Sequence, residues 1–341
     1  MFTPLLVLLG ISTALLSTAF PVEKRASRTS PPSGAVIVKN PAASGQFSTI
    51  QAAINSLPND SSSRTIFIFP GTYSEQVSIT RTGPTTILGS TTDTTSYTSN
   101  SVTITHSLSA AAAGNDDSSG TLRVHKDNFS MYNVNVRNTF GVGSQALALS
   151  SYGNNIGYYG CAFYGYQDTV LANEGTLSCN QYFGVDYIEG AVDYIFGQHA
   201  RVFFQRNVIA SVAAGAITAD GPTSASDTSL FVINRSTVQT STAAKTDLTG
   251  KVFLGRPWTQ WARVAFTNTN LGALINGAGW EIWSTATPNT AAVTFAEFRN
   301  TGTGASGTRA SFSKKLSSTA GYNAADVLGS NWTSWVDQAY V

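Results

Sequence analysis

The segments GYQDTV (residues 165–170) and GAVDYIFG (residues 190–197) share a pattern in which a glycine stands three residues before an aspartate. The two aspartates, Asp168 and Asp193, are therefore 25 residues apart. One coil of a parallel β-solenoid has a comparable length, so the spacing would stack the carboxylates at the distance between neighbouring strands, about 4.8 Å. Two carboxyl groups at this distance favour different protonation states, one protonated and one ionised. The pattern predicts a two-carboxylate site if the chain forms such coils.

Apolar residues with short polar lead-ins recur along the middle of the chain in a way that favours these coils. Their separations are 27, 25, 21, 29 and 33 residues in the series Val136, Phe163, Ile188, Ile209, Val238 and Leu271. Short strands without intervening helices are typical of parallel coils whose loops vary in length. An antiparallel sandwich or a jelly roll is the alternative. The Asn-Gly and Asp-Gly pairs that hairpins favour occur only at 276–277 and 220–221.

The ends of the solenoid are expected to be covered by short helices. Residues 48–51 form a capping box, followed by apolar residues at helical spacing, namely Ile50, Ala53, Ile54 and Leu57. After this helix a short strand is expected at residues 65–69, before Pro70 and Gly71. At the other end, residues 323–341 are expected to protect the last coil, with a helix at 324–328.

The coil register also predicts what lies beside the two aspartates. Each aspartate follows the apolar residue of its own coil by five residues. The same offset gives Gly141 in the preceding coil and Ala214 in the following coil. Because both residues are small, we expect the two carboxylates to lie on the floor of an open groove.

Composition and charge restrict the class of protein. The chain has 341 residues, of which 42% are hydrophobic and only 11% charged, as suits an extracellular protein. Residues 1–19 resemble a secretory signal, and a dibasic pair at 24–25 predicts a short propeptide over 20–25. The remaining single domain, 26–341, has no net charge and no basic field for nucleic acid or membranes. We therefore expect a secreted protein, and we also expect it to be a monomer.

The residues that other catalytic mechanisms need are scarce. His106, His125 and His199 are the only histidines, and none has a second ligand at metal-binding spacing, so neither a metal nor a cofactor is expected. There is no Gly-x-Ser-x-Gly nucleophile elbow and no phosphate-binding glycine loop. Cys161 and Cys179 could form a disulfide or remain two buried thiols. Four sequons predict glycosylation, at Asn59, Asn128, Asn234 and Asn331.

Three polar residues outside the carboxylate pair are candidates for chemistry. Gln167 precedes Asp168, and Gln145 lies about one coil earlier. Amides donate hydrogen bonds without carrying charge, which suits the oxyanion that develops at an ester carbonyl. Arg256 offers a guanidinium fork that could hold Asp193 ionised. The alternatives are a stacking ladder of glutamines and a packed Arg-Pro-Trp loop.

Seven separated blocks together resemble the pectinesterase family over roughly residues 35–305. They are FSTIQAAI (47–54), GTYSE (71–75), QAL (145–147), GYQDT (165–169), GAVDYIFG (190–197), LGRPW (254–258) and GWEIW (279–283). The resemblance implies a right-handed parallel β-helix that hydrolyses methyl esters in pectin. It further implies the fungal secreted type of this enzyme.

The resemblance also implies a role for each matching residue. Asp193 would be the nucleophile, Asp168 the acid and base, Gln145 and Gln167 the oxyanion donors, and Arg256 the partner of Asp193. Aromatic residues would line the sugar groove, namely Trp258, Trp280, Tyr166 and Phe196. Asp220 stands where the family usually has glutamine, which is expected to alter one subsite or the local charge.

Two other functions are compatible with the same fold. A non-catalytic carbohydrate-binding solenoid would keep the groove without turnover. A lyase or glycosidase would shorten the polymer, although inverting glycosidases need carboxylates about 6.5–9.5 Å apart, farther than one coil spacing supplies. The complete set of two aspartates, two glutamines and an arginine favours the esterase.

Overall fold

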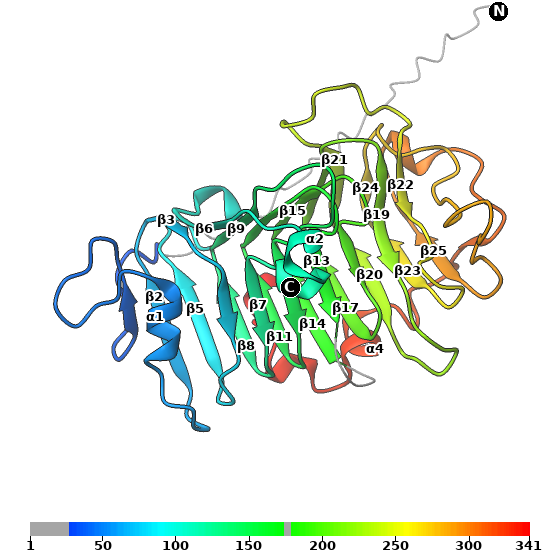
Figure 1. Cartoon of the computed structure of the whole chain (residues 1–341). Coiled ribbons are helices and arrows are strands. Elements are labelled where there is room, and N and C mark those ends of the chain that lie inside the picture. The colour runs from blue at the N-terminus through cyan, green and yellow to red at the C-terminus, as the bar shows by residue number, and fades with distance from the viewer. Residues whose placement is uncertain (1–26, 174–178) are drawn as a thin grey trace, which may run out of the picture.

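The computed structural model describes residues 27–173 and 179–341. The predicted signal and propeptide, 1–19 and 20–25, lie outside this part of the chain. Parallel strands lie side by side along the long axis of the molecule (Figure 1). From β2 to β22, each coil contributes one strand to each of three sheets, which we call sheets I, II and III in the order in which a coil visits them, and the coils at the two ends are incomplete.

The strands of the three sheets have the following bounds. In the described residues, sheet I consists of β1 (Val36–Val38), β2 (Arg64–Ile68), β5 (Thr85–Gly89), β8 (Phe129–Tyr132), β11 (Ile156–Tyr159), β14 (Cys179–Gly184), β17 (Ala200–Gln205), β20 (Leu230–Asn234), β23 (Arg263–Thr267), β25 (Thr294–Phe298) and β26 (Ser313–Lys315). Sheet II consists of β3 (Gly71–Ser74), β6 (Val102–His106), β9 (Asn135–Asn138), β12 (Ala162–Tyr164), β15 (Tyr187–Gly190), β18 (Val208–Ser211), β21 (Thr237–Thr240) and β24 (Asn270–Leu271). Sheet III consists of β4 (Val77–Ile79), β7 (Leu122–His125), β10 (Leu149–Tyr152), β13 (Val170–Asn173), β16 (Ile195–Gly197), β19 (Gly215–Asp220) and β22 (Val252–Gly255).

The strand register confirms the predicted series of apolar residues. All five steps of that series are strand pairs in sheet II: Val136 with Phe163, Phe163 with Ile188, Ile188 with Ile209, Ile209 with Val238, and Val238 with Leu271. All pairings between these named strands are parallel, which a sandwich or jelly roll would not give. The parallel β-helix fold is therefore confirmed.

The core runs through the centre of the coils as stacks of like residues. In sheet I, Tyr158, Phe183 and Phe204 occupy the same position on successive coils, with ring centroids 4.7 and 4.8 Å apart. All three side chains are fully buried. Large buried aromatic side chains contribute strongly to folding, at about 25 cal/mol for each Å² of apolar surface removed from water. This rigid stack is the support from which the turns project.

Helix α1 (Ile50–Asn55) covers the first coil, as predicted, but its cap differs in detail. Thr49 is the N-cap, and its Oγ1 accepts a hydrogen bond from Ala52 N at 3.3 Å. The Glu75 carboxylate accepts from the main-chain nitrogens of Ile50 and Gln51, at 2.8 and 2.9 Å. A carboxylate from the next turn therefore completes the cap that the sequence assigned to residues 48–51.

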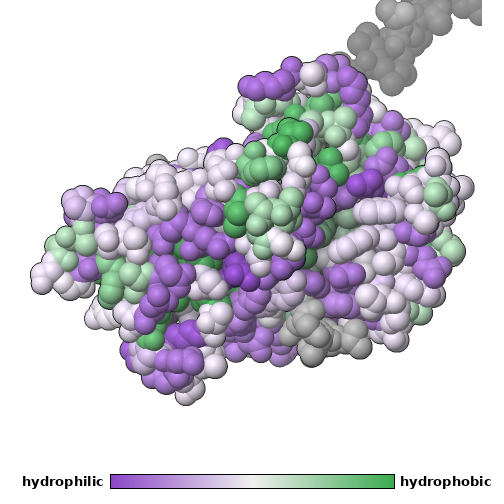
Figure 2. Space-filling model, in the orientation of Figure 1, coloured by the Kyte–Doolittle hydropathy of each residue, from purple (hydrophilic) through white to green (hydrophobic). Residues whose placement is uncertain are grey.

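Two short helices stand on the face of the molecule that Figure 1 presents to the viewer. They are α2 (Ala110–Ala113) and α3 (Asp116–Ser119), and both lie between β6 and β7. Each begins with a side-chain cap, from Ser109 and Asn115 respectively. Figure 2 shows apolar residues gathered near the middle of this face, around α2. These helices stand next to the turn that carries the two aspartates.

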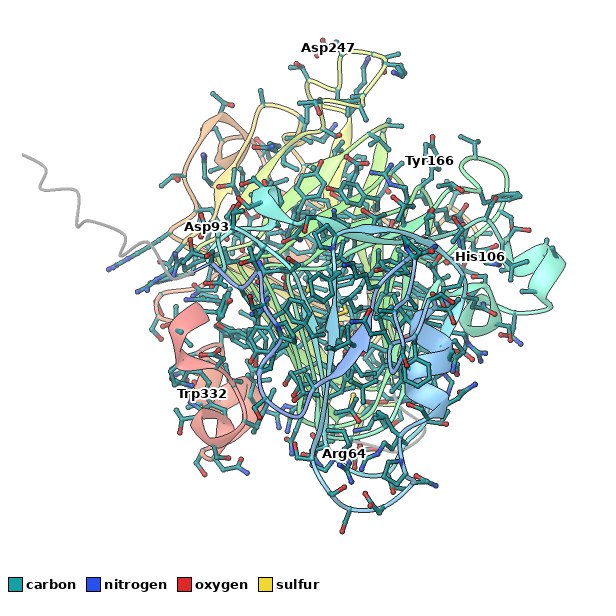
Figure 3. All side chains as sticks on the ribbon, turned by 90° about the vertical axis from the view of Figure 1, so that its left-hand side faces the viewer. Arg64, Asp93, His106, Tyr166, Asp247 and Trp332 are labelled. Atoms are coloured by element: carbon teal, nitrogen blue, oxygen red, sulfur yellow. The ribbon has the colours of Figure 1, made fainter. Side chains whose placement is uncertain are left out.

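The C-terminal segment takes its predicted helix and packs on the β-helix as predicted, although on its side and not over its last coil. Helix α4 (Ala324–Leu328) begins after its N-cap Asn323. The segment does not close the last coil; instead, it packs on the outer face of sheet I, where Tyr182 and Phe203 lie in one buried cluster with Val327. Outward-facing aromatic residues on these strands need cover, which explains the position. Figure 3 shows Trp332 of this segment on the opposite side of the coil from His106.

The remaining predictions concern cysteines, sequons and membranes. Cys161 and Cys179 are both buried thiols, and their sulfur atoms donate to the carbonyls of Met131 and Asn173, at 3.4 and 3.3 Å. Three of the four sequon asparagines are exposed, whereas Asn234 is half-buried. Within residues 27–173 and 179–341, no helix is long and apolar enough to cross a bilayer.

Candidate functional site

The turn between sheets II and III places Asp168 and Asp193 at the same position on successive coils. The residues before them, Gln167 and Val192, form a parallel bridge, and Asp168 N donates to Val192 O at 3.0 Å. Both aspartates have left-handed backbones, with φ of 60° and 49°. Aspartate tolerates this conformation better than most residues, and at both positions the backbone turns in the same way. The predicted stacking of the two residues is confirmed.

The two glycines of the opening pattern are required for close packing. A Cβ on Gly165 would lie 2.6 Å from the Oγ1 of Thr169. A Cβ on Gly190 would lie 2.2 Å from the Cβ of Tyr194. In each coil the residue after the aspartate folds back against the glycine, so the tight turn needs a residue without a side chain. The similar sequences around Asp168 and Asp193 therefore form similar turns.

The predicted neighbours of the aspartates are wrong by a few residues. On one side, Ala146 N donates to Gln167 O and Ala148 N to Thr169 O, so Leu147, not Gly141, lies beside Asp168. On the other side, Asp193 N donates to Ala216 O at 2.8 Å, so Ala214 is not the neighbour. A constant offset fails here because the loops between sheets II and III differ in length.

A cavity of about 190 Å³ opens beside the two aspartates. It is lined by Asp116, Gln145, Gln167, Asp168, Asp193, Phe196, Ala219, Arg256, Trp258 and Trp283. The structure therefore brings together all five residues to which the sequence assigned chemistry, although they are spread over more than a hundred positions of the chain. We call this cavity the carboxylate pocket.

Arg256 holds Asp193 through two parallel hydrogen bonds. Its Nε donates to Oδ1 at 2.9 Å, and its Nη2 donates to Oδ2 at 2.7 Å. The guanidinium also lies over the ring of Trp283, 4.4 Å from the ring centre. A bidentate contact fixes the plane of the carboxylate as well as its charge. Asp193 is therefore oriented by an arginine that is itself held in place by an aromatic ring.

The two aspartates differ in their electrostatic surroundings. Burial, then the charges of Asp193 and Asp116, raise the pKa of Asp168 to about 9. Burial also raises the pKa of Asp193, but the hydrogen bonds and the charge of Arg256 oppose that rise. At neutral pH Asp168 thus holds a proton, while the arginine favours the ionised form of Asp193. The surroundings therefore favour the protonated form more strongly in Asp168 than in Asp193.

Two amide groups complete the polar lining. Gln145 and Gln167 both face the pocket, and neither Nε2 donates to another residue in the described part of the chain. Gln145 is held through its main chain, since Ala110 N of helix α2 donates to its carbonyl at 2.8 Å. Two neutral amides that line a small cavity can donate hydrogen bonds to an oxygen bound there and stabilise its negative charge.

The aromatic wall is only partly the predicted one. Phe196 and Trp258 line the pocket, with ring centres 6.2 Å apart. Trp280 was wrongly predicted to do so. It is 1% exposed and stacks on Phe295 in the core at 4.3 Å. The groove position belongs to Trp283 because the segment leaves the core after Trp280. Tyr166, also predicted, does not line the pocket.

Asp116 is a third carboxylate at the pocket, which the sequence did not suggest. Helix α3 presents it, and the next residue, Asp117, fixes the helix to sheet III. Asp117 accepts hydrogen bonds from three side chains of that sheet, namely Arg123 at 2.5 Å, His125 at 2.7 Å and Ser150 at 2.6 Å. Burial acts to raise the pKa of Asp117, but these bonds outweigh it and hold the pKa well below its usual range. The acidic pair at the start of a short helix was the available sequence signal.

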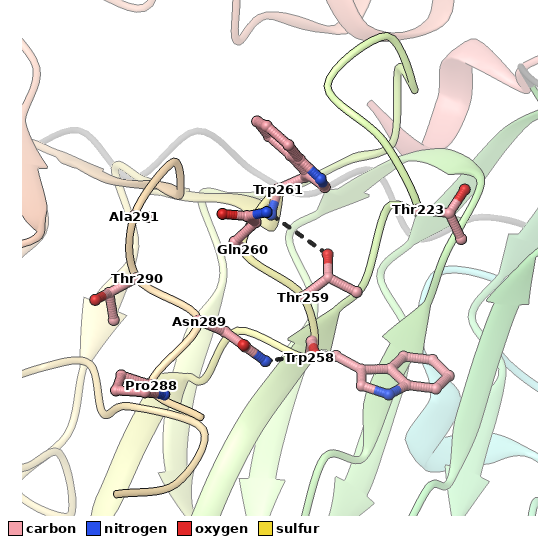
Figure 4. A pocket seen from close by; sticks show the side chains of 9 residues that line it. All are labelled: Thr223, Trp258, Thr259, Gln260, Trp261, Pro288, Asn289, Thr290 and Ala291. Carbon is pink, nitrogen blue, oxygen red and sulfur yellow. Dashed lines mark hydrogen bonds between the residues drawn. The ribbon is translucent and has the colours of Figure 1, made fainter. Parts of the chain in front are cut away.

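A larger hollow of about 640 Å³ adjoins the pocket and shares Trp258 with it (Figure 4). Its lining is neutral, consisting of Thr223, Trp258, Thr259, Gln260, Trp261, Pro288, Asn289, Thr290 and Ala291. Asn289 Nδ2 donates to Trp258 O at 2.9 Å, which ties the two walls together. With no ionisable residue, this neutral hollow can hold part of a ligand but not supply acid or base chemistry.

Asp220, which was expected to alter one subsite or the local charge, does not line the carboxylate pocket or the neutral hollow. Its side chain is fully buried and accepts hydrogen bonds from Ser229 Oγ at 2.7 Å and Arg263 N at 2.6 Å. Burial raises its pKa to about 7, and those hydrogen bonds oppose the rise. The carboxyl group serves the packing of sheet III against sheet I.

The described residues contain no group of three or more histidine, cysteine, aspartate or glutamate side chains arranged to hold a metal.

Comparison with known proteins gives a consistent result. The family model described as pectinesterase matches residues 35–325. A pectinesterase of Aspergillus aculeatus is 47% identical over 341 residues, covering 97% of this chain and 99% of the relative. The crystal structure of the deglycosylated pectin methylesterase of Aspergillus niger superposes with a TM-score of 0.84 at 40% identity, covering 92% of this chain and 100% of that one. Pectin methylesterase from carrot gives 0.79 at 26% identity, with 89% and 97% covered. The chain belongs to the pectinesterase family.

Proposed function

We propose that this protein hydrolyses the methyl esters of galacturonate units in pectin, releasing methanol and leaving free carboxylates. The observation that carries the proposal is the stacking of a buried Asp168, whose pKa is raised, on an arginine-bound Asp193 in the next coil. The family and its named relatives supply the substrate class.

The first step is acyl transfer to Asp193. One carboxylate oxygen of Asp193 attacks the ester carbonyl carbon, forming an oxygen–carbon bond and placing negative charge on the carbonyl oxygen. The amides of Gln145 and Gln167 donate to that oxygen. As the intermediate collapses, the bond to the methoxy group breaks and Asp168 gives its proton to the departing methanol. An anhydride between substrate and Asp193 remains.

The second step returns the enzyme to its starting state. Asp168, now a carboxylate, takes a proton from a water molecule as that water attacks the same carbonyl carbon. The bond to Asp193 breaks, Arg256 again holds a free carboxylate, and Asp168 is again protonated. The product acid ionises and releases one proton to solvent. Neither step calls for a metal ion.

The lining of the cavities suits an esterified sugar chain. Phe196, Trp258 and Trp283 offer flat apolar rings to the faces of pyranose units. The neutral hollow beyond Trp258 suits units whose carboxyl groups are still esterified and therefore uncharged. We further propose that the enzyme is secreted after processing near residue 25 and acts as a monomer.

The deciding experiment measures methanol release from pectins of graded esterification. The rate is expected to rise with esterification and to fall below detection in Asp193→Ala. Turnover should persist after exhaustive chelation. If Asp193→Ala and Asp168→Ala both kept near-normal release, the mechanism would be wrong. A rapid loss of viscosity or the appearance of unsaturated ends would instead indicate a depolymerising enzyme.

A further inference from the structure

The turn between sheets I and II carries a row of exposed, mostly basic residues along the molecule. On four successive coils the residue in this turn is Arg206, Arg235, Asn268 and Arg299, which we call the arginine row. All four have left-handed backbones, with φ between 47° and 57°. Each of the first three donates its main-chain N–H to the next coil, at 3.0, 3.0 and 2.7 Å. The row therefore advances by one strand spacing per coil, about 4.8 Å.

The local backbone does not explain the arginines. Glycine and asparagine adopt the left-handed conformation at lower cost, whereas other residues lose about 1 kcal/mol or more in it. Asn268 fits that preference, but Arg206, Arg235 and Arg299 do not. A position that favours glycine or asparagine holds an arginine on three of the four coils. The guanidinium groups therefore call for an explanation beyond the turn itself.

The charges of the row are largely unneutralised. Arg206 Nη1 donates to Val341 O at 3.4 Å, so this charge lies next to the chain terminus. Arg235 and Arg299 are exposed, and neither forms a salt bridge with a carboxylate of the described residues. Like charges on neighbouring coils repel each other, and an anion bound between them would relieve that repulsion.

Two cavities lie along the row, and each contains at least one of its cations. The first, of about 250 Å³, is lined by Phe203, Gln205, Asn234, Arg235, Asn268, Thr319, Tyr322, Asn323, Ala324, Trp332 and Val341. The second, of about 330 Å³, is lined by Glu297, Phe298, Arg299, Asn300, Ala305, Lys315 and Leu316. A cation and a cavity therefore occur together at two places along the arginine row.

The first cavity has the chemistry of a site for an acidic sugar. Asn268 Nδ2 donates to Asn234 Oδ1 at 3.0 Å, and Asn234 Nδ2 donates to Gln205 Oε1 at 2.8 Å, so amides form a ladder along its floor. The rings of Tyr322 and Trp332 are partly exposed on the other side. Amides suit hydroxyl groups, flat rings suit pyranose faces, and guanidinium suits carboxylates. The Asn234 amide that would carry a glycan is already engaged in this ladder.

We propose that the arginine row and its two cavities bind de-esterified galacturonan, a linear polymer with one carboxylate on each sugar. The inference rests on the proposed function, because this polymer is the product of the reaction. The row lies beside the C-terminal segment, whose Trp332 is on the opposite side of the coil from His106 and the helices beside the carboxylate pocket (Figure 3). The enzyme would then hold de-esterified pectin on one side while it demethylates an esterified segment on the other.

The test compares two double variants with equal loss of charge. Arg235→Gln/Arg299→Gln removes the row, whereas Arg137→Gln/Lys251→Gln removes two exposed cations elsewhere. Binding of a polygalacturonate oligomer is measured by titration calorimetry at low and moderate salt. We expect the row variant to bind about fivefold to tenfold more weakly, with a smaller salt dependence, and the control variant to bind like the wild type. Methanol release from short methyl-esterified oligomers should be unchanged in both.

Several outcomes would overturn the proposal. Equal binding by the row variant and the wild type would do so, as would an equal loss in the control variant. An oligonucleotide of the same charge that bound the row as tightly would mean a general polyanion surface. Arg235→Lys/Arg299→Lys keeps the charges and should retain most of the affinity. Its melting temperature and its affinity, compared with those of the glutamine variant, show whether weaker binding comes from misfolding or from lost contacts. Failure of the proposed function would appear as absent methanol release in every protein and would leave the difference in binding intact.

Discussion

Two arginine–carboxylate pairs in this molecule have nearly the same geometry and very different surroundings. Arg256 holds Asp193 in the carboxylate pocket at 2.9 and 2.7 Å. Arg309 holds Glu297 near the last coil at 2.7 and 3.0 Å. Both carboxylates are buried, with exposures of 5% and 7% for Asp193 and Glu297. Geometry alone does not distinguish a reactive pair from a structural one.

The difference lies in the other hydrogen bonds. Glu297 also accepts from Trp280 Nε1 and Asn300 Nδ2, both at 3.3 Å. Arg309 also donates to three main-chain carbonyls, of Gly277, Ser306 and Gly304. In contrast, Arg256 is the only side chain in the described residues that donates to Asp193, and Asp193 borders an open cavity. The structural pair has its lone pairs occupied, whereas the pair in the pocket keeps some available for an incoming carbon.

The largest effect is expected from removing the negative charge of Asp193. Asn in its place would keep the shape of the side chain and could still accept from Arg256, but it would be a poor nucleophile. We expect Asp193→Asn to lower kcat for methanol release by about 10⁴-fold while the protein stays folded. Glu297→Gln is the matched control and should retain kcat in the folded fraction. Comparable losses of kcat in both variants would contradict the distinction between the pairs.

The two arginines are expected to separate stability from activity. Arg309→Gln leaves a buried carboxylate without its cation, which typically costs about 3–5 kcal/mol of unfolding free energy. Arg256→Gln should cost less stability because water in the pocket can solvate Asp193, but it should lower kcat about 10²-fold. Denaturant unfolding and methanol release, measured on both proteins, give a two-by-two comparison. The distinction fails if Arg256→Gln proves the less stable of the two.

Much of the fold could be predicted because a solenoid repeats. Residues such as Phe163 and Ile188 pair with their counterparts one coil away, so spacing along the chain translates directly into contact. The repeat also located Asp168 and Asp193 correctly relative to each other. Position across the coil was harder to infer, since loop lengths vary and one constant offset misplaced the neighbours of the pair.

The errors at the pocket concern which side of the backbone a residue faces. Trp280 and Trp283 belong to one short block, and only the packing of Trp280 against Phe295 decides which of them reaches the groove. Asp116 depends on helix α3, which is four residues long and is held by Asp117 rather than by its own periodicity. Side-chain contacts of this kind leave no repeating pattern in a sequence.

Asp168 allows the loss of unfolding free energy caused by the carboxylate pocket to be measured. Its raised pKa, about 9, means that the folded protein keeps a proton that the unfolded chain loses near pH 4. Between those values the folded state binds more protons, so this group lowers stability as pH rises. We expect Asp168→Asn to raise the unfolding free energy at pH 7 by about 1–2 kcal/mol, with little gain at pH 3, while activity is lost. Thermal unfolding at several pH values measures this, and equal gains at both pH values would contradict it.

Asp116 gives the smallest and most specific expected effect. Its charge is among those that raise the pKa of Asp168, so Asp116→Asn should lower that pKa. Because Asp168 must be protonated to release methanol, the alkaline fall in kcat should move to lower pH, while the rate at pH 6 stays within about threefold of the wild type. Asp247→Asn removes an equal charge from an exposed loop and should leave the profile unchanged. An unshifted alkaline limb in Asp116→Asn would mean that Asp116 only shapes the rim. A shift would show that the proton on Asp168 is maintained by its carboxylate neighbours as well as by burial, just as Arg256 maintains the charge on Asp193.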